Sequence, residues 1–171
     1  MRVLGISLGT TTTGVAVVSG SQLLHARIHS FRDTWSDEKV VVITSRYERY
    51  LNQYRPKIVV VKVPPRHSHT EAIKHLLKKV ATLFEYHGCM VEYTTKAEVR
   101  IAINNARNHR EVMRHLTDMY PILRPENDRA IAGKNRYHAK LFDAVSAAHL
   151  GKELLRRRSV DGEIMHGQQH L

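Results

Sequence analysis

The chain has 171 residues, 42% apolar and 25% charged, which fits one globular domain with a sizeable core. No apolar run is long enough to cross a membrane, no secretion signal opens the chain, and the single cysteine excludes an internal disulfide. Lysine and arginine number 27 against 16 aspartate and glutamate, a net charge of +11. We therefore expect a cytoplasmic protein whose partner is a polyanion such as nucleic acid.

The first thirty residues predict three antiparallel strands. Residues 3–6 and 15–18 are apolar runs on either side of a Gly-Thr turn, and Ser19-Gly20 leads into a third strand over residues 22–30. Alternation in this third strand predicts one buried face and one wet, basic face. The predicted buried face holds Leu24, Ala26 and Ile28, and the basic face holds His25, Arg27 and His29.

Two helices around an apolar strand are predicted next. Apolar residues recur at three-to-four spacing over residues 37–54, which indicates an amphipathic helix. Residues 57–63 are apolar except for Lys62 and predict a strand. Ser68 and Glu71 have the spacing of a capping box, so we expect the second helix to begin there and to end near residue 88.

The C-terminal half predicts one short strand, at residues 90–93, and three helices. Thr95 and Asn108 each precede a glutamate by three residues, the pattern that opens a helix. Residues 121–137 contain Pro, Gly and Asn without periodicity and predict a long loop, and residues 138–156 predict the last helix.

This order of elements predicts an α/β fold. Three antiparallel strands followed by two parallel strands give a mixed five-stranded sheet flanked by helices. We assign residues 1–156 to this domain and expect residues 157–171 to form a polar, flexible tail.

The same order resembles the RuvC-type Holliday-junction resolvases, a branch of the ribonuclease H-like superfamily. In that family the first strand ends in an aspartate, the fourth strand carries a glutamate, and the last helix carries an aspartate with an aspartate or histidine three residues before it. The matching positions hold Ser7, Lys62, Asp143 and Lys140. The resemblance implies a ribonuclease H-like fold, DNA as the partner, and a homodimer.

The resemblance also implies that catalysis would occur at these four positions, but the residues present there are not the carboxylates that the family uses to bind metal ions. The family cleaves phosphodiesters with two divalent ions held by clustered carboxylates. Ser7 is a weak neutral ligand, and the ammonium groups of Lys62 and Lys140 only donate. Asp143 alone cannot hold two ions. We therefore expect no cofactor and an inactive nuclease whose lysines hold phosphate, although a lysine near a strand end also commonly reaches toward solvent.

Other residues are candidates for contacting nucleic acid. Thr10 and Thr11 lie in the first turn, where hydroxyls and amides either cradle a phosphate or simply stabilise the turn. Basic residues surround the two short helices and the predicted loop. These candidates are Arg100, Arg107, Arg110, Arg114, Arg129, Lys134 and Arg136.

Three hypotheses for function follow from the sequence. The first is a RuvC-like pseudonuclease that binds branched or structured DNA through a basic cleft. The second is an active endonuclease that uses Mg²⁺ or Mn²⁺ at a displaced site around Asp143. The third is a basic scaffold that contacts protein. Metal-dependent cleavage separates the first two, and a steep salt dependence of DNA binding separates the first from the third.

Overall fold

A computed structural model describes residues 1–133 and 137–167, with side chains to residue 160. Its sheet has the order β3-β2-β1-β4-β5. The strands are β1 (Arg2–Ser7), β2 (Thr12–Ser19), β3 (Gln22–Ser30), β4 (Ile58–Lys62) and β5 (Met90–Thr94). The first three strands pair antiparallel, and β4 and β5 continue parallel to β1. The predicted fold class is confirmed.

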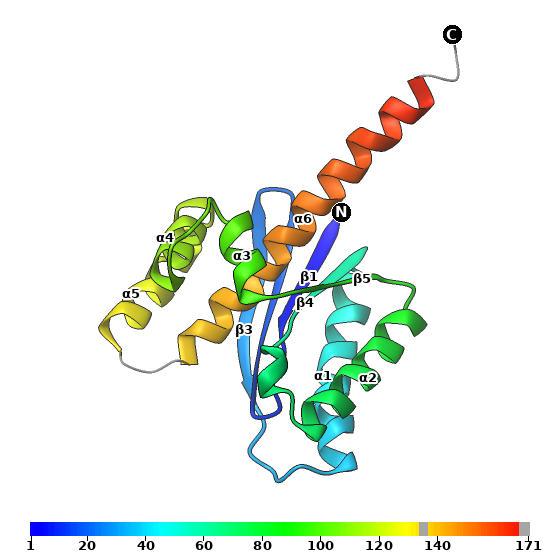
Figure 1. Cartoon of the computed structure of the whole chain (residues 1–171), viewed down its shortest axis with the longest axis vertical. Helices are drawn as coiled ribbons and strands as arrows, with labels where there is room; N and C mark the ends of the chain where they lie inside the picture. The colour runs from blue at the N-terminus through cyan, green and yellow to red at the C-terminus, as the bar shows by residue number, and fades with distance from the viewer. Residues whose placement is uncertain (134–136, 168–171) are drawn as a thin grey trace.

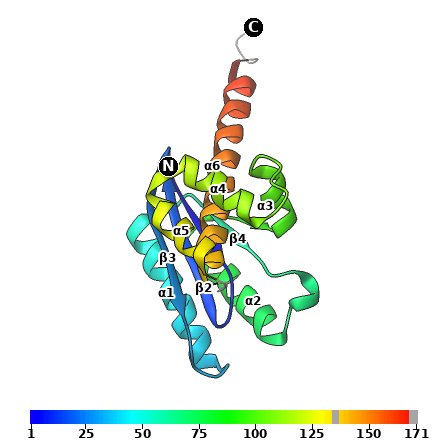
Figure 2. The same ribbon diagram turned by 90° about the vertical axis from the view of Figure 1, so that its left-hand side faces the viewer.

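Helices cover both faces of this sheet. They are α1 (Asp37–Tyr54), α2 (Glu71–Tyr86), α3 (Lys96–Ala102), α4 (His109–Met119), α5 (Arg124–Ala132) and α6 (Tyr137–Gly167), with short 3-10 turns η1 (Arg66–Ser68) and η2 (Pro121–Leu123). Figures 1 and 2 show α1 and α2 on one face, and α6 on the other with α3, α4 and α5 beside it. None of the helices in the described ranges is long and apolar enough to cross a membrane.

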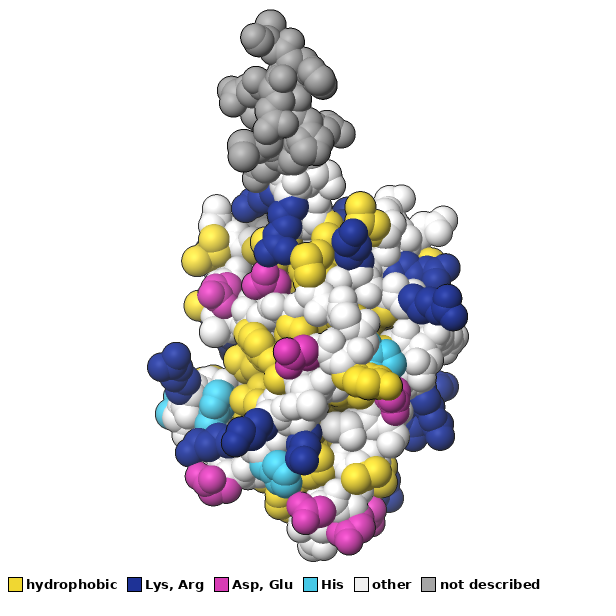
Figure 3. Space-filling view, turned by 90° about the vertical axis from the view of Figure 1, so that its right-hand side faces the viewer, with side chains coloured by type: hydrophobic (Ala, Val, Ile, Leu, Met, Phe, Trp, Pro, Cys, Tyr) yellow, Lys and Arg dark blue, Asp and Glu magenta, His cyan; other side chains and the backbone are white. Residues whose placement is uncertain are grey.

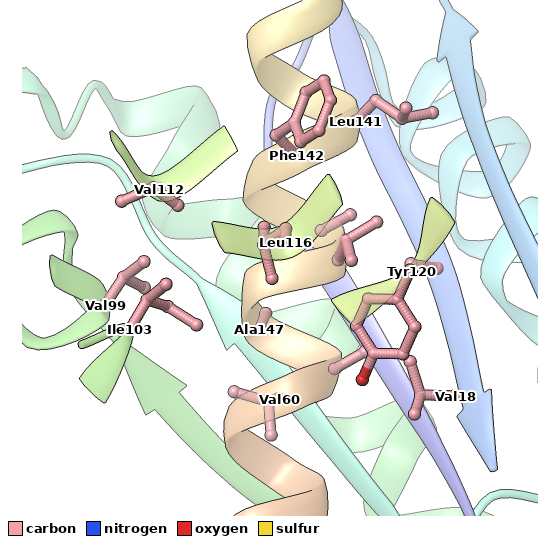
Figure 4. Close-up of a cluster of buried hydrophobic side chains, with 14 of the residues drawn as sticks. Val18, Val60, Val99, Ile103, Val112, Leu116, Tyr120, Leu141, Phe142 and Ala147 are labelled. Carbon is pink, nitrogen blue, oxygen red and sulfur yellow. The ribbon is translucent and has the colours of Figure 1, made fainter. Parts of the chain in front are cut away.

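Each face of the sheet has its own buried core, because successive strand residues point to opposite faces. Leu4 and Val59 face α1 and α2 and pack with Tyr47 and Phe84. The other core, shown in Figure 4, joins alternate strand residues to α6 and to α3 and α4. The labelled members of that core are Val18, Val60, Val99, Ile103, Val112, Leu116, Tyr120, Leu141, Phe142 and Ala147.

Two glycines let α6 lie directly on the sheet. A Cβ at Gly5 would overlap the Ala144 carbonyl and the Ala148 amide, and a Cβ at Gly14 would overlap the Lys140 carbonyl. The absence of a side chain at both positions therefore fixes α6 over β1 and β2. This close contact sets where the residues at the start of α6 lie relative to the strand ends.

The predicted faces of β3 were partly wrong. The pairing with β2 shifts register between Val17 and Val18, so Leu23 packs toward the α6 core and Leu24 is 40% exposed. A bulge of this kind moves one residue out of the alternation. On the face expected to be wet, Arg27 is exposed, whereas His25 and His29 are half-buried because they contact α1.

Three predicted boundaries also need correction. Thr70, rather than Ser68, caps α2. Most of the predicted loop is η2 and α5, and α5 has no buried residue that would mark it by periodicity. Helix α6 runs to Gly167 instead of residue 156, so the predicted domain boundary falls inside a helix. The flexibility expected for residues 157–171 remains a prediction.

Candidate functional site

The structure brings Ser7, Lys62, Lys140 and Asp143 to one end of the sheet. Ser7 and Lys62 end β1 and β4 and lie opposite each other in the parallel pairing. By alternation with Val60, which packs in the α6 core, Lys62 points toward α6. Lys140 and Asp143 lie one turn apart near the start of α6. The four positions form the cation-rich site.

Lys62 and Asp143 form the central contact of this site. The Lys62 Nζ atom lies 2.7 Å from Asp143 Oδ2, and the two side chains are only 13% and 16% exposed. A charge-assisted hydrogen bond at this distance is stronger than one between neutral groups. The Lys62 ammonium thus pairs with the one carboxylate among the four positions of the cation-rich site.

Lys140 is held against the turn between β1 and β2. Its Nζ atom donates to the Leu8 carbonyl at 2.9 Å, and a Cβ at Gly9 would lie 3.0 Å from that nitrogen. Burial lowers the pKa of Lys140, the Asp143 carboxylate opposes this, and the Lys62 charge lowers it further. The turn also holds the candidates Thr10, which is half-buried, and Thr11, which is exposed.

His109, at the start of α4, belongs to the same site, and the sequence analysis missed it. Its Nδ1 atom lies 4.0 Å from Asp143 Oδ1. Burial lowers the pKa of His109; Asp143 opposes this, while Lys62, Lys96 and Arg100 lower it further. The His109 Nε2 and Arg100 Nε atoms are buried without a hydrogen-bond partner within the described chain. Only tertiary packing brings His109 to Asp143, and the local sequence around His109 does not indicate this contact.

These residues do not fit the pair of divalent ions that the family resemblance implies. In the described ranges no group of three or more His, Cys, Asp or Glu side chains is placed to hold a metal ion. The site offers one carboxylate, one imidazole and one serine hydroxyl beside two ammonium groups. Ammonium groups cannot be ligands while protonated, and Mg²⁺ requires several oxygen ligands. The donor chemistry therefore favours an anion over a cation.

The other basic candidates differ in how far they are already paired. The paired ones are Arg107, 2.8 Å from Glu111, and Arg129, 2.9 Å from Glu126. Arg110 and Arg114 are exposed on α4 and form no ion pair with any described residue. Lys134 and Arg136 lie outside the described residues. Among the helical candidates, Arg110 and Arg114 are therefore the most available for an external anion.

An apolar hollow of about 410 Å³ adjoins the cation-rich site on the β5 side. Val63 follows Lys62 in the chain, and Thr94 of β5 pairs with Lys62. The lining includes Val63, Pro64, Pro65, Leu77, Tyr93 and Thr94. Figure 3, which views the right-hand side of Figure 1, shows hydrophobic side chains interspersed with basic and acidic ones on that face. Polar and charged residues, namely Arg66, His69, Thr95 and Glu98, complete the lining of this hollow.

Comparisons with known proteins agree with this architecture. T. thermophilus RuvC in complex with a Holliday-junction substrate is 23% identical with a TM-score of 0.67, covering 86% of this chain and 90% of that one. The chain has a RuvC-type, ribonuclease H-like fold. The yeast mitochondrial Holliday-junction resolvase Ydc2 is 11% identical (TM-score 0.57; 85% and 75% covered). The fowlpox virus resolvase, also solved with Holliday-junction DNA, is 11% identical (TM-score 0.51; 88% and 98% covered).

The likeness lies in structure more than in sequence. No protein-family model matches the chain, and no curated protein matches it. At these identities the RuvC-type fold is established, while residue roles have to be argued from the cation-rich site itself.

Proposed function

We propose that this protein binds branched or structured DNA and does not cleave it by two-metal catalysis. The observation that carries the proposal is the 2.7 Å contact between Lys62 and Asp143. In this contact the Lys62 ammonium lies against Asp143, the residue that the family resemblance assigns to metal binding. Two of the RuvC-fold structures contain Holliday-junction DNA, which supports DNA as the class of ligand.

The charges of the cation-rich site suit a phosphate group. Two lysines face one carboxylate, so the site keeps a net positive charge before His109 is counted. His109, which lies beside Asp143, would add to this positive charge when protonated. Such a site holds a phosphate but does not lower the pKa of a water molecule to make a hydroxide nucleophile.

The exposed arginines of α4 provide a second, wider contact. Arg110 and Arg114 are four residues apart on one helix and share a face. Phosphate contacts of this kind position a duplex without reading its sequence. We therefore expect affinity to depend on salt and on DNA shape more than on base sequence.

A binding panel tests the proposal. Four-way junction, duplex and single-stranded DNA are titrated at several salt concentrations, with EDTA, Mg²⁺ or Mn²⁺. We expect preferential junction binding that EDTA leaves unchanged. Arg110→Ala with Arg114→Ala should reduce the salt slope by roughly two units, one per lost phosphate contact. The charge-matched control, Lys78→Ala with Lys79→Ala on exposed positions of α2, should have a smaller effect.

Two results would redirect the proposal. Binding that requires a divalent ion would favour a displaced, single-metal nuclease around Asp143. Binding that ignores both salt and the arginine variants would favour a scaffold that contacts protein.

A converse experiment restores the family's carboxylates. Ser7→Asp, Lys62→Glu and Lys140→Asp together should create Mn²⁺ binding, measured by calorimetry, that the unmodified protein lacks. Little cleavage is expected, because catalysis also requires the reacting groups to be held in position. Equal Mn²⁺ binding by both proteins would show that the lysines do not exclude the metal.

A further inference from the structure

A second cluster of basic side chains lies on the opposite face of the sheet, between β3 and α1. The Nε2 atoms of His25 and His29 approach the same atom, the Tyr50 hydroxyl oxygen, at 3.0 and 2.7 Å. Arg27 lies between the two histidines on the same strand face. The Tyr50 hydroxyl thus hydrogen-bonds to both imidazole rings, and the exposed Arg27 side chain lies beside them.

The charges around this group are all positive. Burial, followed by Arg46, Arg27 and His25, lowers the pKa of His29 to about 4. No carboxylate contributes to the shifts of either histidine or of Tyr50. Among the described residues, neither Arg27 nor Arg46 forms an ion pair with a carboxylate. An uncompensated cluster of this kind attracts an anion.

This cluster is separate from the cation-rich site. His25 and His29 pair with Val17 and Thr13 of β2, and Val17 packs in the core beneath α1 and α2. Asp143 projects from α6, which covers the other face (Figures 1 and 2). One phosphate cannot contact both sites, since the sheet lies between them.

We infer that Arg27 and Arg46, supported by His25, His29 and Tyr50, form a second phosphate-binding site for the backbone of another DNA arm. Guanidinium groups match phosphate oxygens with paired N–H donors, which favours phosphate among anions. A branched DNA directs its arms away from one another, so two faces of one protein can each meet an arm. The choice of DNA as ligand rests on the proposed function, whereas the anion chemistry does not.

The test compares Arg27→Ala/Arg46→Ala with the Lys78→Ala/Lys79→Ala control, which removes the same charge from α2. For a four-way junction the arginine variant should lower the salt slope by roughly two units and the affinity roughly tenfold or more at low salt. A short duplex, which meets one face only, should lose about threefold or less on the same principle. Arg27→Lys/Arg46→Lys, which keeps the charges, should retain most of the slope.

An unchanged junction slope, or an equal loss in the lysine control, would overturn the second site. If the unmodified protein binds no DNA, the proposed function fails, and the second site is then tested with inorganic tripolyphosphate. Saturable shifts of the His25 and His29 imidazole NMR signals, abolished by Arg27→Ala/Arg46→Ala, would support it. Signals that do not respond would reject it.

Discussion

The cation-rich site should respond unequally to the loss of either partner in its central ion pair. In Lys62→Met, Asp143 loses its 2.7 Å partner but keeps Lys140 and His109 nearby. In Asp143→Asn, both lysines lose the one carboxylate that is shown to interact with them. The second variant therefore leaves like charges together with nothing to offset them.

The size of each effect follows from burial. Removing one member of a fully buried pair costs about 3–5 kcal/mol, and the slight exposure of both side chains reduces this to about 2 kcal/mol for Lys62→Met. Asp143→Asn should lose at least as much, because it removes the carboxylate that offsets the existing repulsion between Lys62 and Lys140. The double variant should lose less than the sum, because it strands no carboxylate.

Urea unfolding, followed by circular dichroism, measures these differences as changes in midpoint at constant slope. The double-mutant cycle should give a coupling energy of about 2 kcal/mol or more. Losses below about 0.5 kcal/mol in both single variants, the range of ordinary surface substitutions, would refute the reasoning. They would mean that the pair is not formed in solution and that the site is open.

Two further predictions concern the fold and its pH dependence. Gly5→Ala should lower the free energy of unfolding by about 3 kcal/mol or more, because the new Cβ overlaps α6. The control Gly133→Ala, at an exposed position with φ of −94°, should change it by less than about 1 kcal/mol. Chemical unfolding of both variants measures the difference. Burial and neighbouring positive charge lower the pKa of His29 from 6.5 to about 4 in the folded protein, so protonation of His29 opposes folding. The free energy of unfolding should therefore not depend on this group above pH 6.5, and it should fall as the pH drops from 6.5 toward 4. After allowance for solvent screening the loss is about 1–2 kcal/mol, and His29→Gln should remove it in unfolding curves taken across this range; an identical pH profile for the variant would contradict the assignment.

Much of the fold could be predicted because local sequence patterns indicate each strand and most helices. Apolar strands such as residues 57–63, and caps such as Thr95 and Asn108, are written within a few residues of sequence. Helix α5 could not be found this way, since none of its residues is buried. The β3 bulge also escaped, because register depends on the pairing with β2 rather than on β3 alone.

The site was predictable only where an ordered pattern spanned the chain. The positions of Ser7, Lys62 and Asp143 followed from matching the strand and helix order to a known family. No local sequence feature predicts that His109 belongs to the site, because its contact with Asp143 depends on how α4 packs beside α6. Likewise Arg46 lowers the pKa of His29 only because α1 packs on the face of β3 that carries His29.

The most direct test of the account is strand cleavage of a four-way junction by sub-stoichiometric protein with Mg²⁺ or Mn²⁺. Binding of the same labelled junction is measured in parallel. The account predicts a stable complex, equally strong in EDTA, and intact strands at every time point. Metal-dependent turnover by the unmodified protein, abolished by Asp143→Asn, would contradict the claim that Lys62 has replaced metal chemistry at this site.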